Sequence, residues 1–254
     1  MSYVKTPKEV EALADAGKRL ASVLAALCEM VQPGLATCEL DVRARALIKE
    51  AGGVPAFLGY AAPGSAKRYP AALCVSVNDV IVHGLPSSYV VREGDVVKLD
   101  VGLKLGGWYA DAARTVLVGN VSLEARRLSV VTEEALAAGI AAAKPRNTVG
   151  DIGAAIATRV RHAGFSIADQ LTGHGIGREL HEAPAVLNVG APGRGQELMP
   201  GMVLAIEPMV AAGSGQVEER EDGSFATKDG SLTAHFEHTV AIAHDGPKVL
   251  TLHS

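Results

Sequence analysis

Apolar residues recur at helical spacing in four segments of the chain. The first segment follows Thr6-Pro7-Lys8-Glu9, which has the form of a capping box with proline at the first helical position, and it ends at Pro33-Gly34. Three further segments show the same spacing, at about residues 38–51, 122–143 and 148–164. The pattern therefore predicts four amphipathic helices.

Runs of β-type residues occupy much of the remaining sequence. Residues 54–70 and 213–230 are rich in glycine and polar residues and are predicted to be loops. Strands are predicted at residues 73–77, 80–82, 203–210 and 234–242, in addition to the longest β-type stretch, residues 96–116.

The stretch 96–116 predicts a hairpin that carries two carboxylates. Gly106-Gly107 lies at its centre and tolerates the positive φ values of a two-residue turn. Such a turn places Asp100 opposite Ala113 and Asp111 opposite Gly102, so both aspartates share one face as diagonal neighbours about 7–8 Å apart at Cα. Burial of both carboxylates requires a compensating cation. For the hairpin alone, two solvated surface aspartates are an equal alternative.

Two of the predicted helical segments resemble each other at a constant offset of 112 residues, since Pro33 matches Pro145 and Leu40 matches Ile152. Each is followed by strand-rich sequence. We interpret this as an internal duplication: residues 1–254 form one domain of two α+β halves, about 1–120 and 121–254, which share one sheet with helices on one side.

Composition excludes several classes of partner. Hydrophobic residues make up 48% and charged residues 20% of the 254 residues, and the net charge is -4, so direct nucleic-acid binding is not predicted. The three cysteines are an odd number without zinc-site spacing, which favours a reducing compartment. The sequence shows neither a signal peptide nor a run long enough to span a bilayer. We expect a cytoplasmic protein without a membrane partner.

The second half of the chain adds polar residues inside apolar segments. Glu207 precedes Pro208, which lacks an N–H, so this carboxylate is predicted at a strand edge or bulge. Glu237 interrupts another apolar strand, and His174 lies between glycines that allow close approach of the backbone. The segment beginning at His181 is not a zincin helix, because Pro184 breaks it.

Four carboxylates in β-type segments repel one another unless cations bind between them. Two divalent ions match the set Asp100, Asp111, Glu207 and Glu237 together with His174. Oxygen donors with one nitrogen favour Mn²⁺, Fe²⁺, Co²⁺ or Zn²⁺. Such a pair of ions lowers the pKa of a bridging water towards about 7. The residues therefore predict a dinuclear metallohydrolase.

Several motifs resemble those of methionine aminopeptidases, in order and in spacing. The matching segments are Lys98-Leu99-Asp100-Val101-Gly102, Ala110-Asp111-Ala112-Ala113-Arg114-Thr115, Gly173-His174-Gly175-Ile176-Gly177, Ile206-Glu207-Pro208-Met209 and Phe236-Glu237-His238-Thr239, with His83-Gly84-Leu85-Pro86 and His181-Glu182-Ala183-Pro184 as two histidine elements. The resemblance covers nearly the whole chain and is to the short, bacterial type I form. It implies an α+β pita-bread (creatinase/aminopeptidase) fold, in which pseudo-twofold halves form a curved antiparallel sheet covered by helices.

The resemblance also implies an activity: removal of the initiator methionine from nascent proteins, with a small second residue preferred. In this reading a metal-bridged hydroxide attacks the first peptide bond. Asp100 would bind one ion, His174 and Glu207 the other, and Asp111 and Glu237 would bridge both. His181 would donate to the oxyanion, His83 would contact the scissile peptide, and Glu207 would shuttle the proton.

By the same resemblance, the methionine side chain would fill a pocket formed by Phe57, Tyr60, Tyr69 and Cys74. A monovalent cation would bind near Asn78, Val80 and Thr233. The expected partners are N-terminal peptides of nascent chains and the ribosome, and we expect a monomer.

Three departures from the family pattern concern the pocket. Leu180 stands at an aromatic position, Phe225 is the nearest aromatic residue to a tryptophan expected in 213–226, and the segment 61–68 is longer than usual.

Other interpretations stay open. His83 and His181 could each be a hydrogen-bonded core histidine, and no functional role is predicted for His162, His235 or His238. A proline-specific aminopeptidase or dipeptidase would use the same fold and metals. An inactive module that binds a partner would not need all five ligands.

Overall fold

The computed structural model describes residues 4–61 and 67–253. Four helices form where the periodicity predicts them: α1 (Pro7–Met30), α2 (Thr37–Glu50), α3 (Leu123–Ala142) and α4 (Val149–His162). The predicted capping box is present, because the Thr6 hydroxyl accepts from the Glu9 N–H and the Glu9 carboxylate accepts from the Thr6 N–H. Most of the predicted longer segment at 61–68 lies outside the described residues.

A nine-stranded sheet runs through both halves of the chain, and all its strand pairs are antiparallel. Its main path is β1-β4-β5-β14-β9-β7-β8, with β2 paired to β4 and β15 paired to β14. The strands are β1 (Val54–Pro55), β2 (Leu73–Val77), β4 (Val96–Leu105), β5 (Trp108–Leu117), β7 (Thr172–Gly175), β8 (Glu182–Leu187), β9 (Val203–Ile206), β14 (Glu237–Ala243) and β15 (Gly246–Val249).

Two three-stranded sheets complete the fold. One joins β6 (Ser166–Ile167), β10 (Met209–Ala211) and β13 (Thr233–His235), and the other joins β3 (Val80–Val82), β11 (Val217–Glu219) and β12 (Phe225–Thr227). The prediction of plain loops at 54–70 and 213–230 is therefore wrong in part. Residues 54–55 pair with β4, and the second segment contains the hairpin β11–β12.

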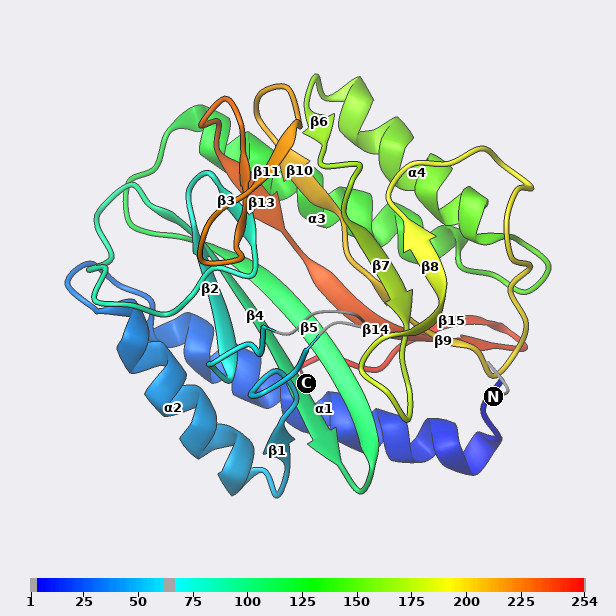
Figure 1. Ribbon diagram of the computed structural model, residues 1–254. Helices are drawn as coiled ribbons and strands as arrows, with labels where there is room; N and C mark the ends of the chain where they lie inside the picture. Colours follow the sequence, from blue (N-terminus) through cyan, green and yellow to red (C-terminus); the bar gives the residue numbers. More distant parts are fainter. Residues whose placement is uncertain (1–3, 62–66, 254) are drawn as a thin grey trace.

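The central hairpin has the predicted register. Leu105 pairs with Trp108, Asp100 with Ala113 and Gly102 with Asp111, and both turn glycines have positive φ. Figure 1 shows β4 and β5 as the longest arrows, side by side above α1.

Two predicted strands are each broken by one short interruption. The predicted strand 203–210 divides into β9 and β10 at Glu207-Pro208, and 234–242 divides into β13 and β14 at Phe236. Pro208 cannot donate to a ladder, which accounts for the first break. At the first break the chain passes from the large sheet to a small one, and at the second it passes from that small sheet into the large one, so both breaks lie at the junction of the sheets.

Successive side chains of β4 and β5 alternate between the apolar core on one face of the sheet and the candidate site on the other. Leu99 and Val101 of β4 and Ala112 of β5 lie in the apolar core that α1 and α2 cover, and α3 and α4 cover an equivalent core in the second half. Because successive side chains point to opposite faces, Asp100 and Asp111 point away from the helices. Figure 1 shows the helices along the rim and behind the sheet, with its other face left to loops and short strands. No helix among residues 4–61 and 67–253 is long and apolar enough to cross a membrane.

Candidate metal centre

A cleft of about 950 Å³ opens on the helix-free face of the sheet. The five predicted metal ligands, both predicted catalytic histidines and all four predicted pocket residues line it: Asp100, Asp111, His174, Glu207 and Glu237; His83 and His181; Phe57, Tyr60, Tyr69 and Cys74. Residues far apart in the sequence thus meet in one cavity.

The ligand candidates come from neighbouring strands of the large sheet. Asp100 and Asp111 lie on the paired strands β4 and β5, Glu237 begins β14 beside β5, and Glu207 follows β9 directly. Donor atoms of Asp111, His174 and Glu237 lie within 4.8 Å of one another, as do those of Glu207, His235 and Glu237. Asp111 and Glu237 are buried, at 4% and 2% exposure.

The electrostatics of this cluster favour divalent cations. Burial raises the pKa of Asp100 to about 7 and that of Glu207 to about 8. Burial and repulsion from neighbouring carboxylates also raise the pKa values of Asp111 and Glu237. Within the described part of the chain, Asp100 Oδ1 and Glu237 Oε1 are buried without a hydrogen-bond donor. Unpaired buried carboxylate oxygens beside an imidazole are the ligands that hard divalent ions require, so the residues fit a two-ion site.

His174 is oriented as a metal ligand. Its Nδ1 lies 2.9 Å from the Gly175 carbonyl oxygen, and a carbonyl accepts, so Nδ1 carries the proton and Nε2 keeps its lone pair. Burial lowers the His174 pKa to about 4, which keeps the ring neutral. The glycines on either side permit the close packing of β7, since a Cβ at Gly173 would lie 2.3 Å from the Ala205 carbonyl oxygen.

His83 and His181 are exposed side chains that line the cleft. The His181 ring packs edge-on against His174, with centroids 4.2 Å apart, and its Nδ1 is hydrogen-bonded to the Tyr60 hydroxyl. His83 packs edge-on against Phe225. The surrounding protein lowers the pKa of His83 to about 4 and that of His181 to about 3, so both are neutral.

The predicted side-chain pocket is an apolar wall of the same cleft. Tyr69 packs edge-on against Phe57, and its hydroxyl donates to the Leu73 and Gly84 carbonyls. Burial raises the pKa of the Cys74 thiol, so Cys74 lines the wall as a neutral group and is no thiolate nucleophile. Leu180 is buried against this wall.

His235 is a residue of this site for which the sequence analysis predicted no function. It is 1% exposed, and its Nε2 lies 3.5 Å from Glu207 Oε2. Its position two residues before Glu237 was the available signal, because residues i and i+2 of a strand share a face. His238 has the other parity and turns away, with Nδ1 bonded to the Thr251 hydroxyl.

The three residues predicted around a monovalent cation also lie together, outside the cleft lining. The Thr233 hydroxyl lies 2.8 Å from the Asn78 carbonyl oxygen and 3.0 Å from that of Val80. The Lys98 ammonium also donates to the Asn78 carbonyl, at 2.7 Å.

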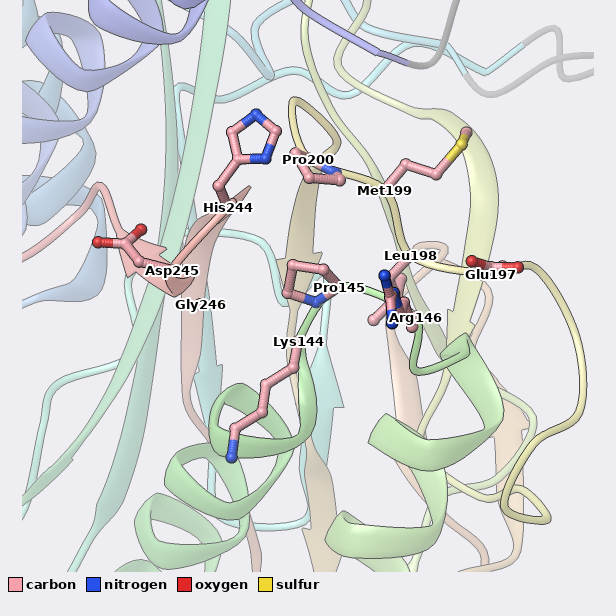
Figure 2. Close-up of a pocket in the computed structure, with 10 residues that line it drawn as sticks. All are labelled: Lys144, Pro145, Arg146, Glu197, Leu198, Met199, Pro200, His244, Asp245 and Gly246. Carbon is pink, nitrogen blue, oxygen red and sulfur yellow. The ribbon is translucent and has the colours of Figure 1, made fainter.

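A second pocket, of about 660 Å³, has different chemistry. Figure 2 shows it between the loops at 144–146 and 197–200 and the turn after β14, with the charged side chains of Lys144, Arg146, Glu197 and Asp245 spread around its edge. Its lining shares no residue with the cleft, so none of the predicted site residues that line the cleft borders this pocket.

Comparisons with known proteins identify the family of the chain. The model of metallopeptidase family M24 matches residues 11–244. A methionine aminopeptidase from Clostridium perfringens is 46% identical, with 99% of each chain covered. The crystal structure of a methionine aminopeptidase from Thermotoga maritima superposes with a TM-score of 0.94 at 42% identity, again over 99% of each chain.

A prolidase from Pyrococcus furiosus shares the fold alone, with a TM-score of 0.80 at 23% identity over 66% of that chain. The comparisons confirm the predicted pita-bread fold. By the family match over most of its length and the identity with full-length relatives, the chain belongs to metallopeptidase family M24.

Proposed function

We propose that this protein is a methionine aminopeptidase that removes the N-terminal methionine from proteins and peptides. The single observation that supports this most is the cleft: four buried or half-buried carboxylates and a neutral imidazole lie beside an apolar wall in a chain of metallopeptidase family M24. Relatives of the same length at 40–46% identity carry that name.

In the proposed site, Asp100, Asp111, His174, Glu207 and Glu237 would hold a pair of divalent ions. Bound there, the ions would balance the carboxylate charge and supply a nucleophile from water at neutral pH. The same ligand types suit Co²⁺, Mn²⁺, Fe²⁺ or Zn²⁺.

The residues of the chain then divide the remaining work. Glu207 takes the proton from the attacking water and passes it to the leaving amine, because its carboxylate borders the cleft beside His174 and can accept and return a proton there. His181 donates Nε2–H to the developing oxyanion in the tautomer in which its Nδ1 accepts from the Tyr60 hydroxyl. His83, open to the cleft, contacts the scissile peptide.

The apolar wall supplies the specificity for methionine. Phe57, Tyr60, Tyr69 and Cys74 surround the unbranched side chain, while a free α-amine lies beside Asp100, which restricts cleavage to N-termini. Leu180, at a position where the family resemblance leads us to expect an aromatic residue, also lines this cleft. A small second residue is expected from the family resemblance.

We further propose that the substrates are nascent chains in the cytoplasm, that the protein meets them at the ribosome, and that it acts as a monomer. The monovalent cation near Asn78, Val80 and Thr233 stays a prediction. Because Lys98 already donates to the Asn78 carbonyl, we expect activity in sodium or potassium to exceed that in choline by less than about twofold.

The test is to strip the protein with chelator, add back Mn²⁺, Co²⁺, Fe²⁺ or Zn²⁺ singly, and follow release of the first residue from Met-Ala-Ser and Ala-Pro-Ser. Metal-dependent release of methionine from the first peptide alone is expected. Cleavage of the proline peptide instead would reassign the substrate to that of a proline-specific peptidase. Absence of cleavage in protein that binds two ions would favour an inactive binding module.

A further inference from the structure

His235 is buried beside Glu207 and Glu237 in the metal site, and its ring nitrogens have no hydrogen-bond partner among the described residues. Its backbone is fixed to β5, because its N–H donates to the Thr115 hydroxyl at 2.9 Å and its carbonyl accepts from the same hydroxyl at 2.7 Å. Strand pairing with Met209 holds it from the other side. The ring is therefore directed into the site by two neighbouring strands and has almost no contact with solvent.

Both ring nitrogens of His235 are unpaired in the part of the chain that the structure describes. A buried imidazole with two unused polar atoms is costly, so a partner is expected when the site is complete. Nε2 lies 3.5 Å from Glu207 Oε2, a few tenths of an ångström beyond a normal hydrogen bond. Glu207 is the polar group towards which it points.

Glu207 lies between two imidazoles, one at each carboxylate oxygen. His174 Nε2 is 3.5 Å from Oε1 and His235 Nε2 is 3.5 Å from Oε2. The two rings differ in what fixes their protons. His174 donates Nδ1–H to a backbone carbonyl, whereas His235 has no such acceptor, so its N–H is free to point to Glu207.

We infer that His235 is a positioning residue that donates Nε2–H to Glu207 Oε2 and thereby holds this carboxylate in place for the divalent ion that Glu207 and His174 bind. An ionised carboxylate only accepts, so the imidazole is the donor in this pair. Partners of this kind orient ligands and raise their affinity for metal. The inference rests on the proposed two-ion site and adds a residue to it.

The burial of His235 agrees with this role. The residue is 1% exposed, so bulk water is excluded as a partner for its ring nitrogens. Glu207 is the carboxylate at ion-pair distance from Nε2.

The test compares His235→Leu, which removes the donor, with His235→Gln, whose side-chain amide restores an N–H donor of similar reach. Titration of Mn²⁺ into chelator-treated protein by calorimetry measures affinity without reference to activity. We expect His235→Leu to weaken the affinity of at least one site about 10–100-fold. His235→Gln should stay within about threefold of wild type, and the exposed His162→Gln should leave it unchanged.

Three outcomes would overturn a claim. Wild-type affinity in His235→Leu would remove the positioning role. Affinity in His235→Gln as low as in His235→Leu, with an altered Co²⁺ absorption spectrum, would make the imidazole a direct ligand and reject the donor role. Failure of wild-type protein to bind metal would reject the proposed function itself. If His235→Leu does not fold by circular dichroism, His235→Asn, whose amide is too short to reach, replaces it.

Discussion

At the scale of single residues, Glu207 combines features that few carboxylates share. It follows β9, precedes a proline that ends the strand, and presents each oxygen to a different imidazole. Burial alone raises its pKa to about 8, so at neutral pH without cations it is largely protonated. A group so placed can bind a cation and exchange a proton at the same atoms.

Replacement of Glu207 by glutamine keeps the shape and removes proton exchange. We expect kcat for Met-Ala-Ser to fall by about 10²–10⁴-fold, since general acid–base contributions have that size. Steady-state kinetics measure this, and circular dichroism checks the fold. The exposed Glu219→Gln at the rim of the cleft is the matched control and should retain full turnover. Wild-type turnover in the Glu207 variant would end the role given to this carboxylate.

Tyr60 sets the protonation of His181. A neutral imidazole has one N–H, and a hydroxyl that donates to Nδ1 leaves that proton on Nε2, which faces the substrate. Tyr60→Phe removes this bias, so we expect a loss of about tenfold in kcat with little change in KM. The measurement is a determination of kcat and KM at pH 7.5. The control is Tyr89→Phe, which removes a hydroxyl that donates to Asp95 and not to a histidine. An unchanged kcat would show that the Tyr60 hydroxyl does not influence catalysis through His181.

At the scale of elements, strands paired within one continuous stretch could be predicted from the sequence, whereas strands paired with distant segments could not. The hairpin β4–β5 was predictable in register because its turn glycines and its alternation lie within one continuous stretch. The hairpin β11–β12 was missed because it carries a polar sequence and is completed by β3, more than a hundred residues earlier in the chain. Pairing with a distant strand leaves little trace in the local pattern.

The same limit applies to His235. The break at Phe236 separates β13 from β14, and the sequence alone did not show that both flanking side chains return to one site. The ligand set came from the position of four carboxylates in apolar β-type segments and of His174 between glycines, and the resemblance to methionine aminopeptidases added the role of each residue. Periodicity alone supported only the two aspartates of the central hairpin.

Strand β7 tests how tightly the site is packed. A Cβ added at Gly173 would lie 2.3 Å from the Ala205 carbonyl oxygen and 3.3 Å from Glu207 Cγ, so β7 or β9 must shift. We expect Gly173→Ala to lower the free energy of unfolding by about 2–4 kcal/mol, in the range of overpacked cores. The neighbouring exposed Thr172→Ala should change it by less than about 0.5 kcal/mol. Urea unfolding curves of both variants measure the difference, and equal curves would contradict the close packing.

At the scale of the whole molecule, the site opposes folding until cations bind. The folded-state pKa values of Asp100 and Glu207 are raised to about 7 and 8, above their unfolded values, so their stabilisation is present at low pH and is lost as pH rises through 7–8. The neutral histidines of the site act in the opposite direction, but only below their unfolded pKa near 6.5. Between pH 6.5 and 8 the carboxylates dominate.

We therefore expect the free energy of unfolding of chelator-treated protein to fall by about 1–2 kcal/mol for each such carboxyl as pH rises from 6.5 to 8. The melting temperature should fall with it. Saturating Mn²⁺ should raise the melting temperature most at pH 8, because ions bind the ionised carboxylates. Differential scanning calorimetry with and without Mn²⁺ measures both effects. The double variant Asp100→Asn with Glu207→Gln should make the profile less steep, with Asp111 and Glu237 giving the slope that remains. A flat profile in wild-type protein would contradict the raised pKa values.

The division into two duplicated halves stays a prediction. Each half contributes a helix pair and an apolar core, and strands of both halves join one sheet through the pairing of β5 with β14. That pairing also brings Asp111 and Glu237 together, so neither half holds a complete ligand set.

The order of the ligands along the chain has a consequence for synthesis. Asp100 and Asp111 leave the ribosome long before Glu237, which comes after the last long loop and opens β14. Until β14 inserts between β5 and β9, the central hairpin has an unpaired edge and half a metal site. A newly made molecule thus gains its sheet and its capacity to bind the metal pair in one late step, and a truncated chain lacking β14 has neither.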